Sequence, residues 1–257
     1  MRTKFNLDSL ILSGFSLAVH ADRAVGKTHL LGDALATEKE TGPVKFINVA
    51  GEDGMLTISA MGLGDIGETI TEYDDLIAIA EELCKSPLQA IALDSLPVLA
   101  KLAMRKVTGS DRLPIIPSSD QLRSGMKNEW PEVHRYMEDA VIKLKRAAKY
   151  VLVAAASDKA VGMLDMASQG RPTMIAPNLP GKEASDSAGW FDFMGYLELK
   201  PVRPGEFKRT LNMAPDNVTR VRQRVPNLIT ERIDLPTGRG GWLKIKSAIE
   251  NACRKEK

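Results

Sequence analysis

The 257-residue sequence predicts an α/β fold: a mainly parallel sheet covered by helices, with an antiparallel extension at its C-terminal side. Two observations support this prediction. Up to about residue 156, short apolar runs alternate with segments of helical periodicity, and several of the runs are apolar throughout. Such runs between helices are typical of parallel strands buried on both faces. After Gly189, shorter strand patterns follow one another directly, which favours antiparallel pairing.

The expected elements follow in a regular order. A strand at 15–19 leads through a short loop into a helix at 27–39, which places Leu30, Leu31, Ala34 and Leu35 on one face. Further strands are expected at 44–49, 89–93 and 150–156, and further helices at 74–84 and 132–149. A long polar stretch occupies 105–130. The extension comprises strands at 195–199, 208–213 and 219–224.

Composition indicates one globular unit. Hydrophobic residues make up 44% of the chain and charged residues 26%. Since no repeat or Gly/Ser-rich linker divides the chain, we expect a single domain over residues 1–257, with a core at about 15–199 and a basic extension at about 200–257. Cys84 and Cys253 fit neither a disulfide framework nor a zinc pattern. This favours a reducing, cytoplasmic setting.

Positive charge is concentrated near the C-terminus. The net charge is +2, but residues 200–257 carry about 14 Lys and Arg against about 6 Asp and Glu. The segment therefore carries roughly +8, and the rest of the chain roughly −6. This distribution suggests a polyanionic partner. A solvated basic face is an equally good interpretation.

The loop after the first strand carries Gly26-Lys27-Thr28. Glycine lets backbone N–H groups approach phosphates, lysine reaches β- and γ-phosphate oxygens, and the threonine hydroxyl coordinates Mg²⁺. The helix start adds the positive end of its dipole to the same anion site. We therefore expect ATP and Mg²⁺ to bind a segment that comprises Asp22, Arg23, Ala24, Val25, Gly26, Lys27, Thr28 and His29.

One position departs from the usual G-x-x-x-x-G-K-[ST] pattern, because Ala21 stands where the first glycine is expected. Its methyl group could tighten the loop or weaken affinity. The tripeptide Gly-Lys-Thr also recurs by chance at the start of surface helices. The buried strand before it and the amphipathic helix after it favour the phosphate site.

A second anchor is Asp94, which ends the apolar strand at 89–93. A carboxylate at the carboxyl end of a parallel strand can hold Mg²⁺-bound water opposite Thr28. Thr28 and Asp94 are therefore the predicted metal residues. Taken alone, an aspartate at a strand end is more often a turn former or a helix cap.

A third anchor follows the strand at 44–49, which we expect next to the strand at 15–19. Its end runs into Glu52 and Asp53, and a carboxylate there can orient and polarise an attacking water. Glu52 is the predicted catalytic base, alongside Lys27 as the second catalytic residue, and Asp53 is the second choice of base. A solvated acidic turn is the alternative.

With these anchors in order, the chain resembles RecA-like P-loop ATPases, and among them the phage AAA-domain group associated with single-strand annealing and recombination. Coverage runs from about residue 15 to 199. The early motifs occur in many P-loop enzymes, so the last segment carries most of the narrower assignment. The resemblance rests on Gly26-Lys27-Thr28, Phe46-Ile47-Asn48 before Glu52, Leu93-Asp94-Ser95, residues 150–155, and Pro177-Asn178-Leu179-Pro180-Gly181-Lys182 followed by Phe191-Asp192.

The resemblance implies ATP hydrolysis, a homo-oligomer with nucleotide near subunit interfaces, and single-stranded DNA as partner, with a single-strand DNA-binding protein as a further partner. It makes Ser157 a polar sensor of the γ-phosphate, although an ordinary strand-to-loop serine is the alternative. An interface ATPase also needs a cation from a neighbouring subunit. The candidates are Lys182 and Arg222, with Arg220 and Arg224 beside them.

The same resemblance places loops near 105–128 and 158–176 toward DNA. Aromatic side chains are nearly absent there, so contact would depend on phosphate charge and carry little sequence preference. The basic residues available are Arg105, Lys106, Arg112, Arg123, Lys127, Lys159 and Arg171.

Two other functions stay open. A nucleotide-switched DNA-binding protein with little hydrolysis would suit Ala21. A small-molecule kinase shares a P-loop and a downstream aspartate, but the sequence shows no arginine-rich lid.

Overall fold

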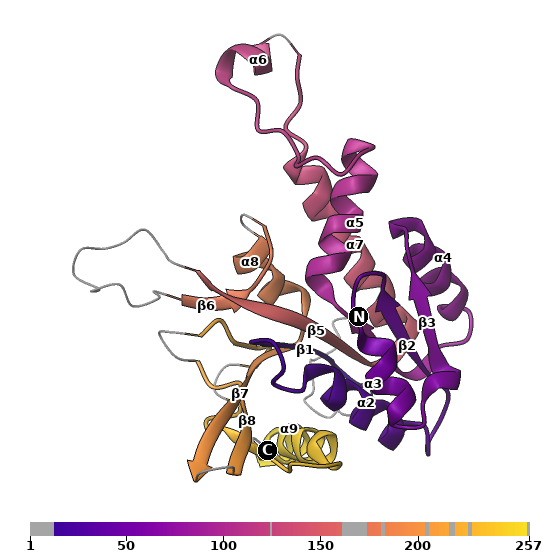
Figure 1. The fold of residues 1–257 in the computed structure, drawn as a ribbon, viewed down its shortest axis with the longest axis vertical. Coiled ribbons are helices and arrows are strands. Elements are labelled where there is room, and N and C mark those ends of the chain that lie inside the picture. The colour runs from indigo at the N-terminus through magenta and orange to yellow at the C-terminus, as the bar shows by residue number, and fades with distance from the viewer. Residues whose placement is uncertain are drawn as a thin grey trace, which may run out of the picture.

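The computed structural model describes residues 13–123, 125–160, 174–180, 183–203, 206–215, 219–225 and 228–255. Its centre is a sheet with the strand order β10-β8-β7-β1-β5-β4-β2-β3 (Figure 1). The pairs from β7 to β3 along this path are parallel, and β8 and β10 extend the sheet antiparallel. The parallel strands are β1 (Ser16–Ala21), β2 (Val44–Val49), β3 (Gly67–Ile70), β4 (Leu88–Asp94), β5 (Ala148–Ala160) and β7 (Phe193–Arg203).

The remaining strands lie at one side of the sheet. β8 (Glu206–Asn212) pairs with β7 and with β10 (Ile233–Leu235). Two short strands, β6 (Met174–Pro177) and β9 (Arg222–Gln223), pair antiparallel with β5 and β7. The predicted fold class, a mainly parallel α/β sheet with a C-terminal antiparallel extension, is confirmed.

Helices cover both faces (Figure 1). One core lies under α2 (Lys27–Glu38), α3 (Gly54–Ala60) and α9 (Gly241–Lys255), and a second lies under α4 (Tyr73–Leu83), α5 (Leu96–Thr108) and α7 (Trp130–Ala147). Successive strand side chains point to opposite faces, so Leu17 and Val19 enter the first core and Ala18 the second. The shorter helices are η1 (Gly64–Ile66), α6 (Ser119–Arg123), α8 (Glu183–Asp186) and η3 (Ser187–Trp190).

Several details differ from expectation. The strand at 44–49 is not next to β1, because β5 and β4 lie between them. The polar stretch at 105–130 contains the end of α5 and an arm that carries α6 away from the body of the molecule (Figure 1). Of the strand expected at 219–224, only β9 forms. No helix among the described residues is long and apolar enough to cross a bilayer.

The C-terminal helix is fixed to α2 by two buried carboxylates. Asp33 accepts the backbone N–H groups of Gly240 and Trp242, each at 2.8 Å, and so caps the start of α9. Glu38 accepts hydrogen bonds at 2.7 Å from Trp242 Nε1, Lys246 Nζ and Gln89 Nε2. The last helix is therefore part of the same core as the helix that follows the predicted phosphate loop.

Candidate functional site

The P-loop, residues 21–28, joins β1 to α2. Gly26 has φ +98°, a conformation that side chains other than glycine's rarely adopt. Ala21 is instead the last residue of β1, buried and paired in register with Ala156. Extended backbone suits alanine as well as glycine, so the departure from the usual motif causes no backbone strain at this position.

The nucleotide-binding residues predicted from the motif form the loop and the first turn of α2. Asp22, Arg23 and Ala24 are exposed, and residues 25–29 are half-buried. Lys27 Nζ donates to the backbone oxygens of Ala21 at 3.0 Å and Asp22 at 2.9 Å. Burial lowers the pKa of Lys27, while the charges of Asp94 and Glu52 oppose that shift. The ammonium group is thus held between loop carbonyls and near two carboxylates.

Thr28 and Asp94 meet at the carboxyl ends of the strands. Thr28 Oγ1 donates to Asp94 Oδ2 at 2.6 Å. Asp94 is 4% exposed, and burial raises the pKa of its carboxyl group, with Glu52 adding to the rise and Thr28 opposing it. The Asp94–Ser95 peptide bond is cis. The two side chains predicted to hold a metal therefore lie in direct contact.

A buried oxygen next to this pair also lacks a partner. Among the described residues, none donates a hydrogen bond to Asn48 Oδ1. A Cβ built on Gly54 would lie 2.9 Å from Asn48 Oδ1 and 3.0 Å from Asp94 Oδ2, so both oxygens face the start of α3. A hydroxyl, a carboxylate and an amide oxygen are the donors that Mg²⁺ accepts, which makes the site a fit for that ion. The described residues hold no cluster of three His, Cys, Asp or Glu ligands, so phosphate and water would complete the coordination.

Glu52 reaches the same place by a different route from the one expected. Although β2 is not adjacent to β1, the turn after it brings the Glu52 carboxylate to the end of β4, where Ser95 Oγ donates to Glu52 Oε1 at 2.5 Å. Asn48 Nδ2 also donates to the Glu52 carbonyl at 3.2 Å. Glu52 is half-buried, whereas Asp53 is exposed. Sequence reasoning assigned no role to Ser95 or Asn48, although both stand in the motifs it used.

Ser157 lies close to the P-loop strand but within a longer strand than expected, since β5 continues to Ala160. Burial lowers the pKa of His20 to about 4, so its ring is neutral near pH 7. His20 Nε2 lies 2.7 Å from the Arg220 carbonyl, which can only accept, and therefore carries the proton. His20 Nδ1 then accepts from Ser157 Oγ at 2.9 Å. The Ser157 hydroxyl is bonded to His20 in this arrangement.

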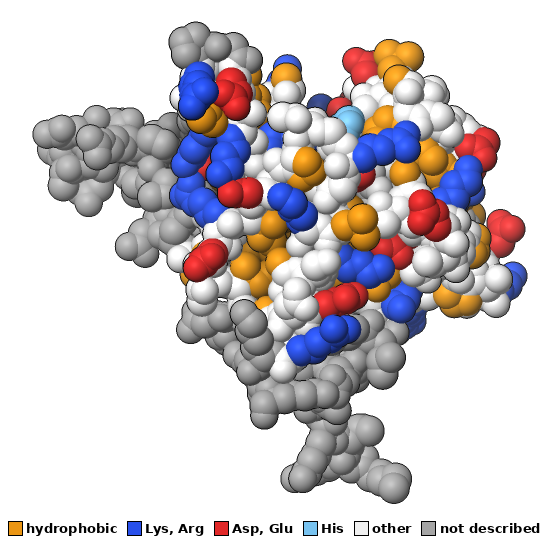
Figure 2. All heavy atoms as spheres, turned by 90° about the horizontal axis from the view of Figure 1, so that it is seen from below, with side chains coloured by type: hydrophobic (Ala, Val, Ile, Leu, Met, Phe, Trp, Pro, Cys, Tyr) orange, Lys and Arg blue, Asp and Glu red, His pale blue; other side chains and the backbone are white. Residues whose placement is uncertain are grey.

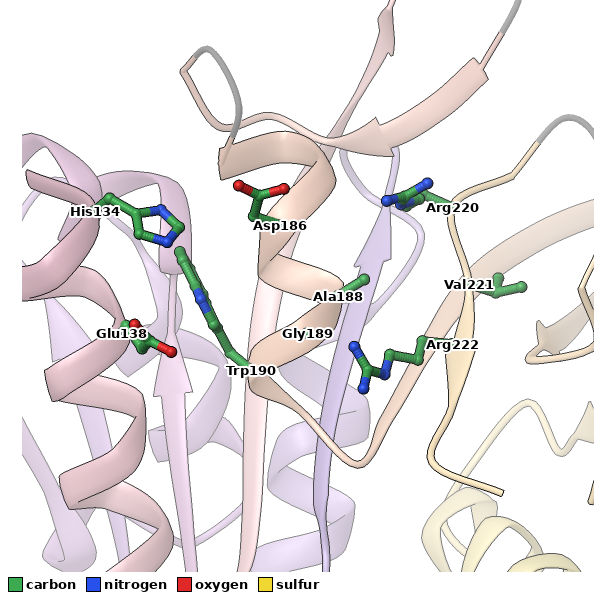
Figure 3. Close-up of a pocket in the computed structure, with 9 residues that line it drawn as sticks. All are labelled: His134, Glu138, Asp186, Ala188, Gly189, Trp190, Arg220, Val221 and Arg222. Carbon is green, nitrogen blue, oxygen red and sulfur yellow. The ribbon is translucent and has the colours of Figure 1, made fainter. Parts of the chain in front are cut away.

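The basic residues considered for contact across a subunit interface lie elsewhere. Lys182 is outside the described residues. Arg220 and Arg222 line a pocket with His134 and Glu138 of α7 and with Trp190 (Figure 3). Helix α7 covers the sheet face opposite α2, so Arg222 does not face the P-loop of its own chain. Arg224 Nη1 donates instead to Asp192 Oδ1 at 2.7 Å.

Asp192, part of the most specific segment of the resemblance, has a structural environment. It is 5% exposed and accepts from Ser16 N at 2.9 Å and Ser16 Oγ at 2.8 Å, besides Arg224 and Lys145. Burial alone would raise the pKa of Asp192, but the Ser16 bonds and the two cations lower it below its usual value. Asp192 therefore ties the starts of β1 and β7 to α7.

Most of the cations expected to face DNA form ion pairs within the chain. Arg112 makes two hydrogen bonds of 2.7 Å to Glu129 at the base of the arm. Lys159 and Arg171 lie outside the residues whose side chains are described. The other pairs are Arg105 with Asp111 and Glu72, Lys106 with Asp74, and Arg123 with Asp120.

Comparison with known proteins gives one family. A family model described as an AAA domain matches residues 13–225. No curated protein matches the chain. Among solved structures, the chain is similar to a KaiC-like protein from the hyperthermophilic archaeon Pyrococcus horikoshii, with a TM-score of 0.48, 12% identity, and coverage of 88% of this chain and 87% of that one.

Proposed function

Since the chain belongs to the AAA-domain family, we propose that it binds ATP with Mg²⁺, hydrolyses it, and acts on single-stranded DNA. The observation that carries the proposal is the contact between Thr28 Oγ1 and Asp94 Oδ2 beside Lys27. A P-loop and a strand-end carboxylate were predicted separately from the sequence, and 66 residues separate them along the chain. In the fold they share one site at the helix N-terminus, where phosphates are favoured.

Each residue has a distinct part in binding. The P-loop backbone and the start of α2 hold the phosphate oxygens, and Lys27 exchanges its two loop carbonyls for β- and γ-phosphate oxygens. Thr28 and Asp94 would hold Mg²⁺, which neutralises developing charge on the phosphates. Asp94 is nearly buried, so a cation there relieves the cost of keeping its carboxylate ionised.

Glu52 is the proposed general base. Its carboxylate is fixed by the Ser95 hydroxyl and lies near enough to Lys27 and Asp94 to affect the pKa of both. In hydrolysis Glu52 takes the proton of the attacking water, whose oxygen forms the new bond to the γ-phosphorus while the bond to ADP breaks. A base that is oriented by a second side chain is typical of such sites.

Single-stranded DNA is proposed on the resemblance and on exposed basic residues at the end of α5 and in the arm, residues 109–123 and 125–128. The ion pairs of Arg105, Lys106 and Arg123 are exposed, and exposed pairs contribute only about 0–1 kcal/mol. Phosphates can therefore replace their carboxylate partners at little cost. We further propose that the protein forms homo-oligomers and serves phage recombination, annealing or replication.

One experiment tests the function: ATP turnover by the wild-type chain, E52Q and D53N, each with and without single-stranded DNA. We expect DNA-stimulated turnover in the wild type and in D53N, and turnover reduced at least 100-fold in E52Q with ATP affinity retained. D53N is the matched control because Asp53 is the exposed neighbour of Glu52. Full turnover in E52Q would exclude Glu52 as the base. Binding of DNA without turnover would favour a nucleotide-switched binding protein, and indifference to DNA would exclude the DNA role.

A further inference from the structure

An arginine far along the chain lies against the P-loop. Arg209 is in β8, two strands from β1 on the side away from β4. A Cβ built on Gly26 would lie 3.0 Å from Arg209 Nη1. The guanidinium group therefore lies beside Gly26, the loop residue that precedes Lys27, although Gly26 and Arg209 are 183 positions apart in the sequence.

The orientation of this guanidinium group is fixed. Arg209 Nη2 donates to the backbone oxygens of Pro236 at 2.7 Å and Thr237 at 2.8 Å, and reaches Gly238 O at 3.4 Å. These carbonyls belong to the segment between β10 and α9, whose far end is capped by Asp33 of α2. The segment that supports Arg209 is thus hydrogen-bonded to the P-loop helix.

The other end of the guanidinium group has unused donors. Within the part of the chain that the structure describes, no acceptor bonds to Arg209 Nη1 and no carboxylate lies within 4.0 Å of the side chain. Arg209 is half-buried, and burial lowers its pKa. The charge of Asp33 opposes this shift from beyond ion-pairing distance. A partly buried cation without an ion-pair partner is costly. Since its free donors face a loop built for anions, a bound anion would remove that cost.

The surroundings add positive potential. His29 of α2 and Arg209 line one small cavity together with Asp33 and Pro236. Arg209, Arg239 and Asp33 all lie close enough to His29 for their charges to act on it. The two arginines therefore supply positive charge on this side of the P-loop, and the carboxylate of Asp33 offsets part of it.

The two sides of the P-loop correspond to different parts of a nucleotide. Thr28, Asp94 and Glu52 lie toward β4, where we placed the γ-phosphate and Mg²⁺. Arg209 lies on the other side, toward β8, next to Gly26. P-loop backbone amides hold the α- and β-phosphates, so the phosphate nearest Gly26 and farthest from Asp94 is the α-phosphate.

We propose that Arg209 binds the α-phosphate of the nucleotide from within the same chain, through its Nη1 donors. This inference rests on the proposed nucleotide binding and adds a residue to it. A contact at the α-phosphate stabilises ATP and ADP alike, because both carry that group. Arg209 is accordingly a binding residue that retains nucleotide before and after hydrolysis.

The test is calorimetric titration of ATP and of ADP into the wild-type chain, R209Q, R209K and R232Q. Glutamine can still donate to the carbonyls of the 236–238 segment but carries no charge. A charge-assisted hydrogen bond accounts for about a 10-fold or greater change in affinity. We expect R209Q to weaken ATP and ADP equally by at least that factor, and R209K to weaken both less.

R232Q is the matched control, because Arg232 is an exposed arginine that does not line the P-loop. Its Nη1 donates to Glu198 Oε2 at 3.0 Å. It should bind both nucleotides as the wild type does. Wild-type affinity in R209Q would overturn the proposal, as would a loss for ATP alone, which would place the contact at the γ-phosphate. A purely structural role would lower the melting temperature of R209Q without changing its affinity.

If R209Q does not fold, R209K decides: equal weakening of ATP and ADP supports the contact, and wild-type affinity overturns it. Failure of the two proposals is distinguishable. No ATP binding by the wild-type chain would refute the proposed function itself, whereas wild-type binding with unaffected Arg209 variants refutes only the α-phosphate contact.

Discussion

Replacing Glu38 by glutamine should destabilise the protein strongly, although Glu38 lies outside the candidate site. The side chain is 1% exposed and accepts hydrogen bonds at 2.7 Å from Trp242 Nε1, Lys246 Nζ and Gln89 Nε2. Those donors come from α9 and β4, so one carboxylate joins these two elements to α2. Glutamine has nearly the same shape but no charge, and its amide N–H₂ must face at least one of the donors.

The magnitude follows from the number of bonds. A hydrogen bond to a charged group contributes about 1.5–3 kcal/mol, and a neutral one about 0.5–1.5 kcal/mol. Loss of one of these bonds and weakening of the other two, as the carboxylate charge is removed, therefore cost on the order of 3 kcal/mol. This is close to the 3–5 kcal/mol typical of breaking a buried ion pair. E40Q is the control, since exposed Glu40 is the second residue after the end of α2 and such surface changes stay within about 0.5 kcal/mol.

Chemical denaturation followed by tryptophan fluorescence measures both the free energy of unfolding and the docking of α9, because Trp242 is fully buried against α2. We expect E38Q to unfold at lower denaturant with a red-shifted native spectrum, and E40Q to match the wild type. A loss smaller than about 1 kcal/mol in E38Q would show that the three bonds do not hold α9 in place.

Two other substitutions test the site and the fold. Without Mg²⁺, T28A should bind nucleotide as tightly as the wild type does. Mg²⁺ should raise the affinity of the wild type and of T28S but not that of T28A. Titrations with and without Mg²⁺ that show no difference between T28A and T28S would contradict a metal role. D192N addresses acid stability: the native pKa of Asp192 is lowered, so its contribution is present above the unfolded pKa of about 3.9 and is lost as pH falls through the native pKa. The melting temperature of D192N should therefore be below that of the wild type at pH 7 and approach it toward pH 3, and a constant difference between the two would contradict this role.

The sequence predicts the centre of the site because its parts are local. Gly26, Lys27 and Thr28 are consecutive, and Asp94 ends an apolar strand whose burial is evident from composition. Parallel strands gather their carboxyl ends at one edge, so two such ends can be expected to meet even when their order is unknown. The order itself depends on long-range packing, which is why β2 was wrongly placed next to β1.

The remainder of the site depends on contacts that no local pattern contains. Ser95 supports Glu52 only because a turn after β2 crosses to the end of β4. Arg209 reaches Gly26 only because β8 lies beside β7 and β7 beside β1. Helix α9 did have a signal, since Trp242, Ile245, Ile249 and Cys253 recur at helical spacing and are all buried.

Part of the excess positive charge after residue 200 has a structural role within the fold. Several of the basic residues after 200 neutralise acidic groups of the rest of the fold: Lys246 pairs with Glu38 and Arg224 with Asp192, both buried carboxylates. Lys208 and Arg232 pair with Asp234 and Glu198 at the surface. The face that includes β7, β8 and α9 accordingly shows basic side chains interspersed with acidic ones (Figure 2).

The buried and the surface ion pairs differ in how easily a polyanion could replace the acidic partner. Phosphates could replace the surface partners at a cost of about 1 kcal/mol or less. Removing Lys246 or Arg224 costs more, because it takes a cation away from a buried carboxylate. Net charge in this segment therefore overstates its capacity to bind nucleic acid. The exposed pairs at the end of α5 and in the arm, formed by Arg105, Lys106 and Arg123, are the better place to look for the DNA contact, because breaking them disturbs no buried group.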